Sequence, residues 1–140
     1  MNWLLDTNIV SEMWKSRPNA AAVAWLGENM DDCALSEITF GELHYGIHRL
    51  PFGKRRSELV RHISFLREDY RDVILPFGAV ESEAWGEFAA AVDADRGKKF
   101  WTARTIRDSA IAATARAWNL TVVTRDLGHF PLVATLNPFN

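Results

Sequence analysis

Short runs of apolar residues alternate along this chain with longer stretches in which apolar residues recur at three- and four-residue steps. The short runs predict strands over residues 3–5, 33–35, 73–75, 120–124 and 133–136. The longer stretches predict helices over residues 8–14, 20–28, 36–49, 54–69, 79–95 and 109–118. Strands that alternate with helices through short connections form a parallel sheet covered on both faces. The pattern predicts a single α/β domain over residues 1–140, a three-layer α/β/α sandwich around a five-stranded parallel sheet.

Residues that cap or interrupt helices mark several of these boundaries. Ser36 stands where a side chain can accept a hydrogen bond from the first turn of the following helix. Gly97 ends one helix, and Asp108 is expected to open the next one. Residues 96–107 are therefore predicted to form a loop.

The composition is that of an ordinary globular domain, with 140 residues of which 48% are hydrophobic and 24% are charged. No apolar run approaches the roughly 18 residues that a membrane span requires. No basic segment followed by an apolar one marks a signal peptide. Cys33 is the only cysteine, so an internal disulfide is excluded and a reducing compartment is favoured. We expect a cytoplasmic protein that does not contact a membrane.

The predicted loop carries five basic residues and no acidic one, although the whole chain has a net charge of −2. The basic residues are Arg96, Lys98, Lys99, Arg104 and Arg107. Phe100 and Trp101 lie in the middle of the loop. Cations beside aromatic rings are typical of single-stranded nucleic-acid binding, where phosphates meet charges and bases stack on rings. The alternative is a solvated loop with one buried tryptophan.

Four acidic residues occupy comparable places relative to the predicted strands. Asp6 directly follows the first strand, and Asp126 directly follows the fourth. Glu42 lies among apolar positions in the helix after the second strand, and Asp108 precedes the fourth strand by one helix. Because the carboxyl ends of parallel strands share one edge of a sheet, we expect these acids to converge there. Asp108 reaches that edge only if its helix begins there.

Several carboxylates at one place repel one another and need a cation to remain ionised. Oxygen ligands with open water positions suit Mg²⁺ or Mn²⁺, and such an ion supports phosphodiester hydrolysis by activating water and stabilising charge. Thr7, Asn8 and Thr124 supply hydroxyl and amide groups that can orient the acids. The sequence thus predicts a divalent-metal site with the four acids as candidate ligands.

Each acid also has a purely structural interpretation. These are an Asx turn for Asp6, a helix cap for Asp108, a turn beside Arg125 for Asp126, and an ion pair with Arg49 or Lys54 for Glu42. The joint pattern favours the metal site. His44 and His48 lie four residues apart, but no glutamate follows the first of them as a metalloprotease requires, so they are interpreted as ordinary helix residues.

Four segments, taken together, resemble the PIN-domain family. They are residues 4–8 (LLDTN), 35–43 (LSEITFGEL), 108–115 (DSAIAATA) and 123–126 (VTRD). The resemblance covers essentially the whole chain. More narrowly, the chain resembles the VapC and FitB type of toxin from bacterial toxin–antitoxin pairs, and its closing residues 137–139 (NPF) resemble the FitB-like branch.

This resemblance implies a divalent-metal-dependent endoribonuclease that hydrolyses RNA, with Mg²⁺ or Mn²⁺ as cofactor. Matching positions are Asp6, Glu42 and Asp108 for the principal acids, Asp126 for a fourth acid, and Thr7 and Thr124 for polar supports. Arg107 beside the third acid is less usual for the motif. The resemblance also implies a homodimer and a cognate DNA-binding antitoxin that blocks the active site. Operator DNA would then be contacted only through the antitoxin.

Two other function classes stay open on the sequence. One is a non-catalytic module that binds nucleic acid or a protein partner, and the other is a metal-dependent deoxyribonuclease. Six tryptophans and eight phenylalanines are many rings for a core of this size. Trp14, Trp25 and Phe52 are therefore candidates for a partner surface, the alternative being that they pack the core.

Overall fold

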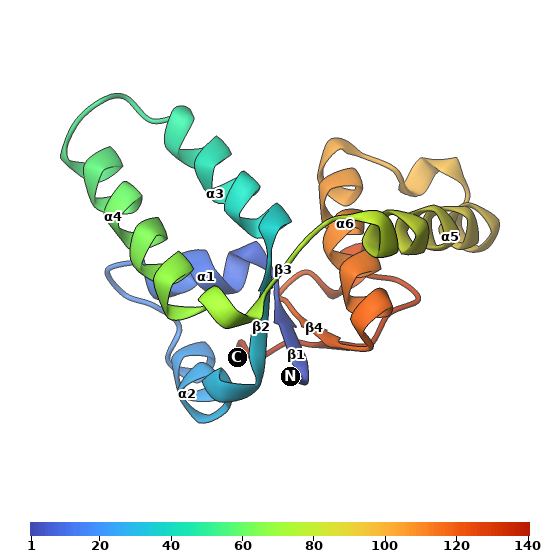
Figure 1. Ribbon diagram of the computed structural model, residues 1–140, viewed down its shortest axis with the longest axis horizontal. Helices are drawn as coiled ribbons and strands as arrows, with labels where there is room; N and C mark the ends of the chain where they lie inside the picture. The colour runs from blue at the N-terminus through green and yellow to red at the C-terminus, as the bar shows by residue number, and fades with distance from the viewer.

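A parallel sheet stands at the centre of the computed structural model, which describes residues 1–140 (Figure 1). Its five strands follow the order β3-β2-β1-β4-β5, and every neighbouring pair is parallel. The strands are β1 (Trp3–Leu5), β2 (Cys33–Ser36), β3 (Ile74–Leu75), β4 (Thr121–Val123) and β5 (Thr135–Leu136). The predicted five-stranded parallel sheet is confirmed.

Six α-helices cover the two faces of the sheet. They are α1 (Thr7–Met13), α2 (Ala20–Asn29), α3 (Glu37–His48), α4 (Lys54–Asp69), α5 (Ala79–Arg96) and α6 (Ala103–Trp118). Short 3₁₀ turns are η1 (Met30–Asp32), η2 (Arg71–Val73), η3 (Lys98–Phe100) and η4 (Leu127–His129). Figure 1 shows α1 to α4 on one side of the sheet, and α5 and α6 on the other. None of the helices combines the length and the apolar character needed to cross a bilayer.

Two hydrophobic cores lie on opposite faces of the sheet because successive strand residues point to opposite sides. Leu4 of β1 and Val122 of β4 belong to the core under α5 and α6. Their neighbours Leu5 and Val123 belong to the core under α1, α3 and α4. All four side chains are buried. This burial on both faces explains why the strands are nearly continuous apolar runs in the sequence.

The middle strand β1 has β2 on one side and β4 on the other, so the direction of the strand order reverses at β1. In open α/β sheets the crevice outside the carboxyl end of a strand at such a reversal is where ligands bind. The residue that follows β1 is Asp6.

The last long helix begins at Ala103, six residues before the predicted start, so the prediction that Asp108 opens this helix is wrong. Thr102 caps the helix: its hydroxyl accepts a hydrogen bond from the Thr105 N–H, and its own N–H donates to the Thr105 hydroxyl. This reciprocal pair satisfies backbone donors of the first turn. The basic segment is therefore partly helical, and Asp108 lies in the second turn of α6.

Several other boundaries differ from the prediction by one or two residues. Helix α1 begins at Thr7, because Asp6 accepts the Thr7 N–H as its N-cap. Val73 belongs to the turn η2 instead of the third strand. The fifth strand pairs with β4 only at Thr135 and Leu136, because a turn with a left-handed residue, Leu132 (φ 59°), precedes it. The predicted cap at Ser36 is confirmed, since its hydroxyl accepts the Ile38 N–H.

The aromatic residues mostly pack the cores. Trp14 and Trp25 are half-buried against the core under α1, α3 and α4, as the packing alternative predicts. Phe100 and Trp101 pack against the other core, so they are not free rings of a loop. Phe52 is 89% exposed in the α3–α4 connection.

Candidate active site

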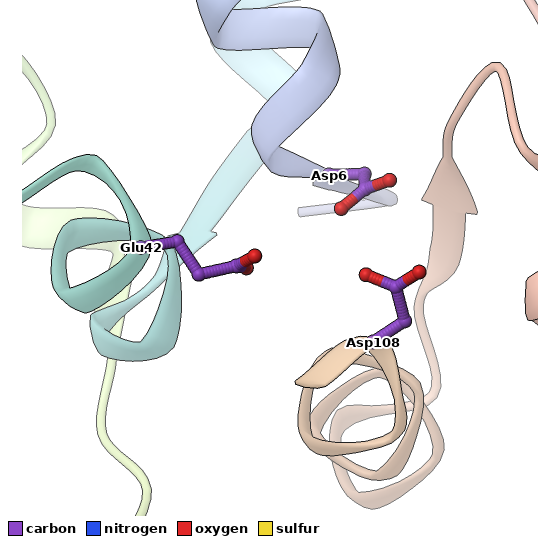
Figure 2. A group of neighbouring side chains, drawn as sticks. All are labelled: Asp6, Glu42 and Asp108. Atoms are coloured by element: carbon purple, nitrogen blue, oxygen red, sulfur yellow. The ribbon is translucent and has the colours of Figure 1, made fainter. Parts of the chain in front are cut away.

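Three carboxylates converge at the carboxyl end of β1 (Figure 2). Asp6, Glu42 and Asp108 each offer an oxygen atom, and these oxygens all lie within 4.8 Å of one another. Figure 2 shows the three side chains pointing into one space from three different elements. We call them the acidic triad.

Each member of the acidic triad is placed by a different local structure. Asp6 ends β1 and caps α1, so its carboxylate is fixed at the edge of the sheet. Glu42 lies in the second turn of α3, which starts directly after β2. Asp108 reaches the same edge from α6, which begins five residues earlier. Asp6 and Asp108 are buried, and Glu42 is half-buried.

Hydroxyl groups and one histidine hold these carboxylates in place. The Thr124 hydroxyl donates to Asp6 Oδ2 at 2.8 Å, and the Thr7 hydroxyl donates to Glu42 Oε1 at 2.9 Å. The His129 Nδ1 lies 2.9 Å from Asp108 Oδ2. Thr7 and Thr124 thus orient the acids, as the sequence suggests.

The surroundings raise the pKa of all three carboxyl groups. Burial, and next the negative charge of Asp108, raise the pKa of Asp6 to about 7. Burial is also the main reason why the pKa values of Glu42 and Asp108 lie above their ordinary range. The hydrogen bond from Thr7 and the contact with His129 act in the opposite direction on these two groups. A buried group of acids that resists ionisation is the electrostatic signature of a site that takes a cation.

The acidic triad opens into a cavity of about 240 Å³ without any hydrophobic lining residue. Besides the triad, its walls are Thr7, Asn8, Ser11, Lys15, Arg104, Arg107 and Arg125. Four of these are basic, yet none of them forms an ion pair within 4.0 Å with a triad carboxylate. An anionic centre is thus surrounded by a cationic rim, an arrangement suited to a metal ion and a phosphate group together.

Comparison with known proteins places this fold and site in a family. The family model described as PIN domain matches residues 3–135. The chain is 37% identical to the toxin FitB of Neisseria gonorrhoeae, with 98% of each chain covered. It is 35% identical to a VapC ribonuclease of Sinorhizobium fredii, over 91% of this chain and 89% of the relative.

The chain belongs to the PIN-domain family.

Solved structures of similar proteins have the same fold as this PIN domain. A crystal structure of FitAcB from Neisseria gonorrhoeae superposes with a TM-score of 0.84 at 36% identity, covering 97% of both chains. A structure of FitAB bound to a DNA fragment superposes with a TM-score of 0.86 at 32% identity, covering 99% of this chain and 96% of the other. The resemblance seen in the sequence motifs is confirmed over the whole chain.

The fourth acid of the PIN domain, Asp126, lies outside the acidic triad. Its Oδ2 atom accepts hydrogen bonds from Arg104 Nη2 at 2.9 Å and from Asn8 Nδ2 at 3.1 Å. Asn8 therefore supports Asp126 and not a member of the triad. Asp126 is therefore more than a turn residue beside Arg125, because its carboxylate holds the side chains of Arg104 and Asn8.

The other structural interpretations have mixed outcomes. Asp6 does cap a helix, and it does so while belonging to the triad. The alternative of an ion pair between Glu42 and Arg49 or Lys54 is wrong, because Glu42 bonds to Thr7 and Arg49 lies over the Tyr45 ring. The exposed residues His44 and His48 belong to no metal-binding group.

The five basic candidates divide into two groups. Arg104 and Arg107 line the cavity, because positions 104, 107 and 108 share one face of α6 at three- and four-residue spacing. Arg96, Lys98 and Lys99 do not line it. Arg96 pairs with Asp95 instead.

Sequence reasoning missed four residues of the site: Ser11, Lys15, Arg125 and His129. Lys15 and Arg125 reach the cavity from the end of α1 and from the segment after β4. Both also lie near the buried carboxylate of Glu12, at 2.8 and 3.7 Å. The only available signal was that Arg125 and His129 follow the fourth strand, at the edge where the acids were expected.

Proposed function

We propose that this PIN domain is the toxin of a two-component toxin–antitoxin system and that it acts as a divalent-metal-dependent endoribonuclease. The observation that carries the proposal is the convergence of three carboxylates, two buried and one half-buried, that pair with no lysine or arginine although a basic rim surrounds them. The printed names of its relatives, a VapC ribonuclease and the toxin FitB, support the same activity. The chain is a hydrolase that cuts RNA phosphodiester bonds.

The residues of the acidic triad fit a hard divalent ion. They supply only carboxylate oxygens, which Mg²⁺ and Mn²⁺ prefer. Burial, and next the repulsion by Asp108, raise the pKa of Asp6, and a bound cation would offset both effects. Asp6, Glu42 and Asp108 would hold the ion. Bound there, it supplies activation of a water molecule and stabilisation of the charge that develops on the phosphate.

The side chains around the acidic triad position the substrate and the acids. Lys15, Arg104, Arg107 and Arg125 place positive charge around the cavity, where the RNA phosphates neighbouring the cleaved bond would lie. Thr7, Thr124 and His129 keep the carboxylates turned toward one another. The reaction needs an ordered set of charges, and these contacts order them before substrate arrives.

An antitoxin that covers this site is the partner we propose for the chain. A second cavity of about 280 Å³ lies beside the first and shares Thr7, Ser11 and Glu42 with it. Its walls include six hydrophobic residues, namely Trp14, Leu43, Ile47, Leu50, Leu59 and Ile63. An apolar groove that runs into a charged site suits a peptide segment that anchors in the groove and reaches over the acids. Operator DNA would be bound through the antitoxin, and the toxin would form a homodimer.

Cleavage of RNA by the purified protein tests the proposal. We expect cutting of a structured RNA pool with Mg²⁺ or Mn²⁺ and none in EDTA, because the acidic triad cannot be neutralised without an ion. Cutting of duplex DNA but not RNA would favour a deoxyribonuclease. Tight RNA binding with no metal-dependent cleavage would favour a non-catalytic module.

Replacing His129 with alanine should weaken metal binding by about 10- to 100-fold, the usual effect of removing a residue that orients a metal ligand. The reason is that His129 fixes one oxygen of Asp108. Calorimetric titration of Mn²⁺ into both proteins measures the effect. The exposed residue His44 provides the matched control, and His44→Ala should bind Mn²⁺ like the parent. Equal affinity of His129→Ala and the parent would contradict the orienting role.

A further inference from the structure

Asp126 is tied to three other residues of the site. Its Oδ2 atom accepts from Arg104 at 2.9 Å and from Asn8 at 3.1 Å. Its backbone N–H donates to the Thr124 hydroxyl at 2.9 Å, and that hydroxyl donates to Asp6 Oδ2 at 2.8 Å. A continuous chain of hydrogen bonds therefore connects the Arg104 guanidinium to the acidic triad.

Arg104 lines the same cavity as the triad. Its side chain is 60% exposed, whereas that of Asp126 is only 27% exposed. A long exposed arginine samples many rotamers unless a partner holds it, and this ordering costs free energy. The ion pair with Asp126 uses one terminal nitrogen of the guanidinium. The remaining N–H groups of its planar fork stay available for an oxyanion.

The same contacts argue against Asp126 as a metal ligand. The guanidinium and the Asn8 amide both donate to one of its two oxygens, and a cation next to that oxygen would face the positive charge of Arg104. Asp126 also lies outside the group of acids whose oxygens approach within 4.8 Å. Its negative charge is already balanced by Arg104.

We propose that Asp126 is a positioning residue that holds Arg104 over the cavity, and that Arg104 binds an RNA phosphate next to the one held at the acidic triad. The identity of the anion rests on the proposed function. The metal ion at Asp6, Glu42 and Asp108 rests on it as well, whereas the contact of Asp126 with Arg104 does not.

If Asp126 positions Arg104, removing this negative charge should weaken RNA binding instead of strengthening it. Removing a negative charge near a phosphate site strengthens RNA binding when only the charge matters. If Asp126 positions Arg104, its removal weakens RNA binding, because the arginine loses its orientation. We expect Asp126→Ala and Arg104→Ala each to weaken binding of a fluorescent single-stranded RNA by about tenfold, in the range of a hydrogen bond to a charged group.

The double variant provides the decisive comparison. Asp126→Ala combined with Arg104→Ala should bind RNA no more weakly than Arg104→Ala alone, since Asp126 acts through Arg104. Fluorescence anisotropy of the labelled RNA in EDTA measures these affinities without any cleavage. With Mg²⁺, the KM values of the parent and the variants should follow the same order as the affinities, while kcat changes less. Arg71→Ala breaks an exposed ion pair with Glu68 near the start of β3, at the end of the sheet opposite to the triad; it is the matched control and should leave RNA affinity unchanged.

A metal titration separates positioning from ligation. Calorimetry with Mn²⁺ should give Asp126→Asn a Kd within about twofold of the parent, whereas Asp6→Asn should lose at least about tenfold. Loss of Mn²⁺ binding in Asp126→Asn, additive losses in the double variant, or tighter RNA binding by Asp126→Ala would each overturn the proposal. A parent that binds RNA but does not cleave it would instead refute the proposed function and leave this comparison intact.

Discussion

Replacing Asp6 with asparagine is expected to lower RNA cleavage by about 10³-fold or more, while the protein stays folded. Asparagine keeps the size of the side chain and an oxygen that can accept the Thr7 N–H, so α1 keeps its cap. It removes one of the three charges that would hold the metal ion. Initial rates of cleavage with Mg²⁺, together with circular dichroism of both proteins, measure the effect.

Two further variants and one control make this prediction specific to the acidic triad. Glu42→Gln and Asp108→Asn should lose cleavage to a similar degree, because each removes another of the converging charges. Glu37→Gln changes an exposed acid of the same helix α3 that pairs with Arg67, and it should cleave like the parent. Cleavage by Asp6→Asn at the parental rate would rule out the mechanism.

The stability of the metal-free protein should fall as the pH rises from about 4 to about 7. The pKa of Asp6 is about 7 in the folded chain, against 3.8 for an exposed aspartate side chain. Between these values the folded state binds more protons than the unfolded state, so the free energy of unfolding decreases with rising pH. The contribution is fully present below the unfolded pKa and is lost as the pH rises through 7. With about 1.4 kcal/mol for each pKa unit, the full loss is on the order of 4 kcal/mol.

Thermal unfolding of the parent and of Asp6→Asn in EDTA measures this loss. The variant lacks the ionising group, so it should be more stable than the parent at pH 8, and the difference should shrink toward pH 4.5. Mg²⁺ should raise the Tm of the parent at pH 8 more than that of the variant, because only an ion bound to the folded state stabilises it. A Tm difference that does not change with pH would contradict the raised pKa of Asp6.

Part of the last long helix was mispredicted for a physical reason. Residues 103–107 carry two arginines and no apolar stripe, so their hydrophobic pattern does not indicate a helix. The helix starts there because Thr102 and Thr105 bond to each other's backbone. A threonine at both positions is a weaker sequence signal than the usual pair with glutamate or glutamine. The error mattered, since it hid that Arg104, Arg107 and Asp108 share one face.

The contacts of charged side chains were harder to predict from the sequence than the start of this helix. Asp126 and Arg104 are 22 residues apart, and their contact depends on how the segment after β4 lies beside α6. Glu42 stands near Arg49 in the sequence but bonds to Thr7, which is 35 residues away. Contacts between distant residues follow from the packing of whole elements, and local spacing says little about them.

The sequence by itself determined the strands, the parallel sheet and the place of Asp6, because apolar runs must be buried and a polar residue that follows one must lie at its end. It also provided the motifs of the PIN-domain family. Only the tertiary structure decided that three acids meet within 4.8 Å, that Asp126 binds Arg104, and that Lys15, Arg125 and His129 complete the site. The burial of apolar residues can be predicted from local sequence patterns. The contacts of charged side chains depend on how the helices pack against the sheet, which local patterns do not show.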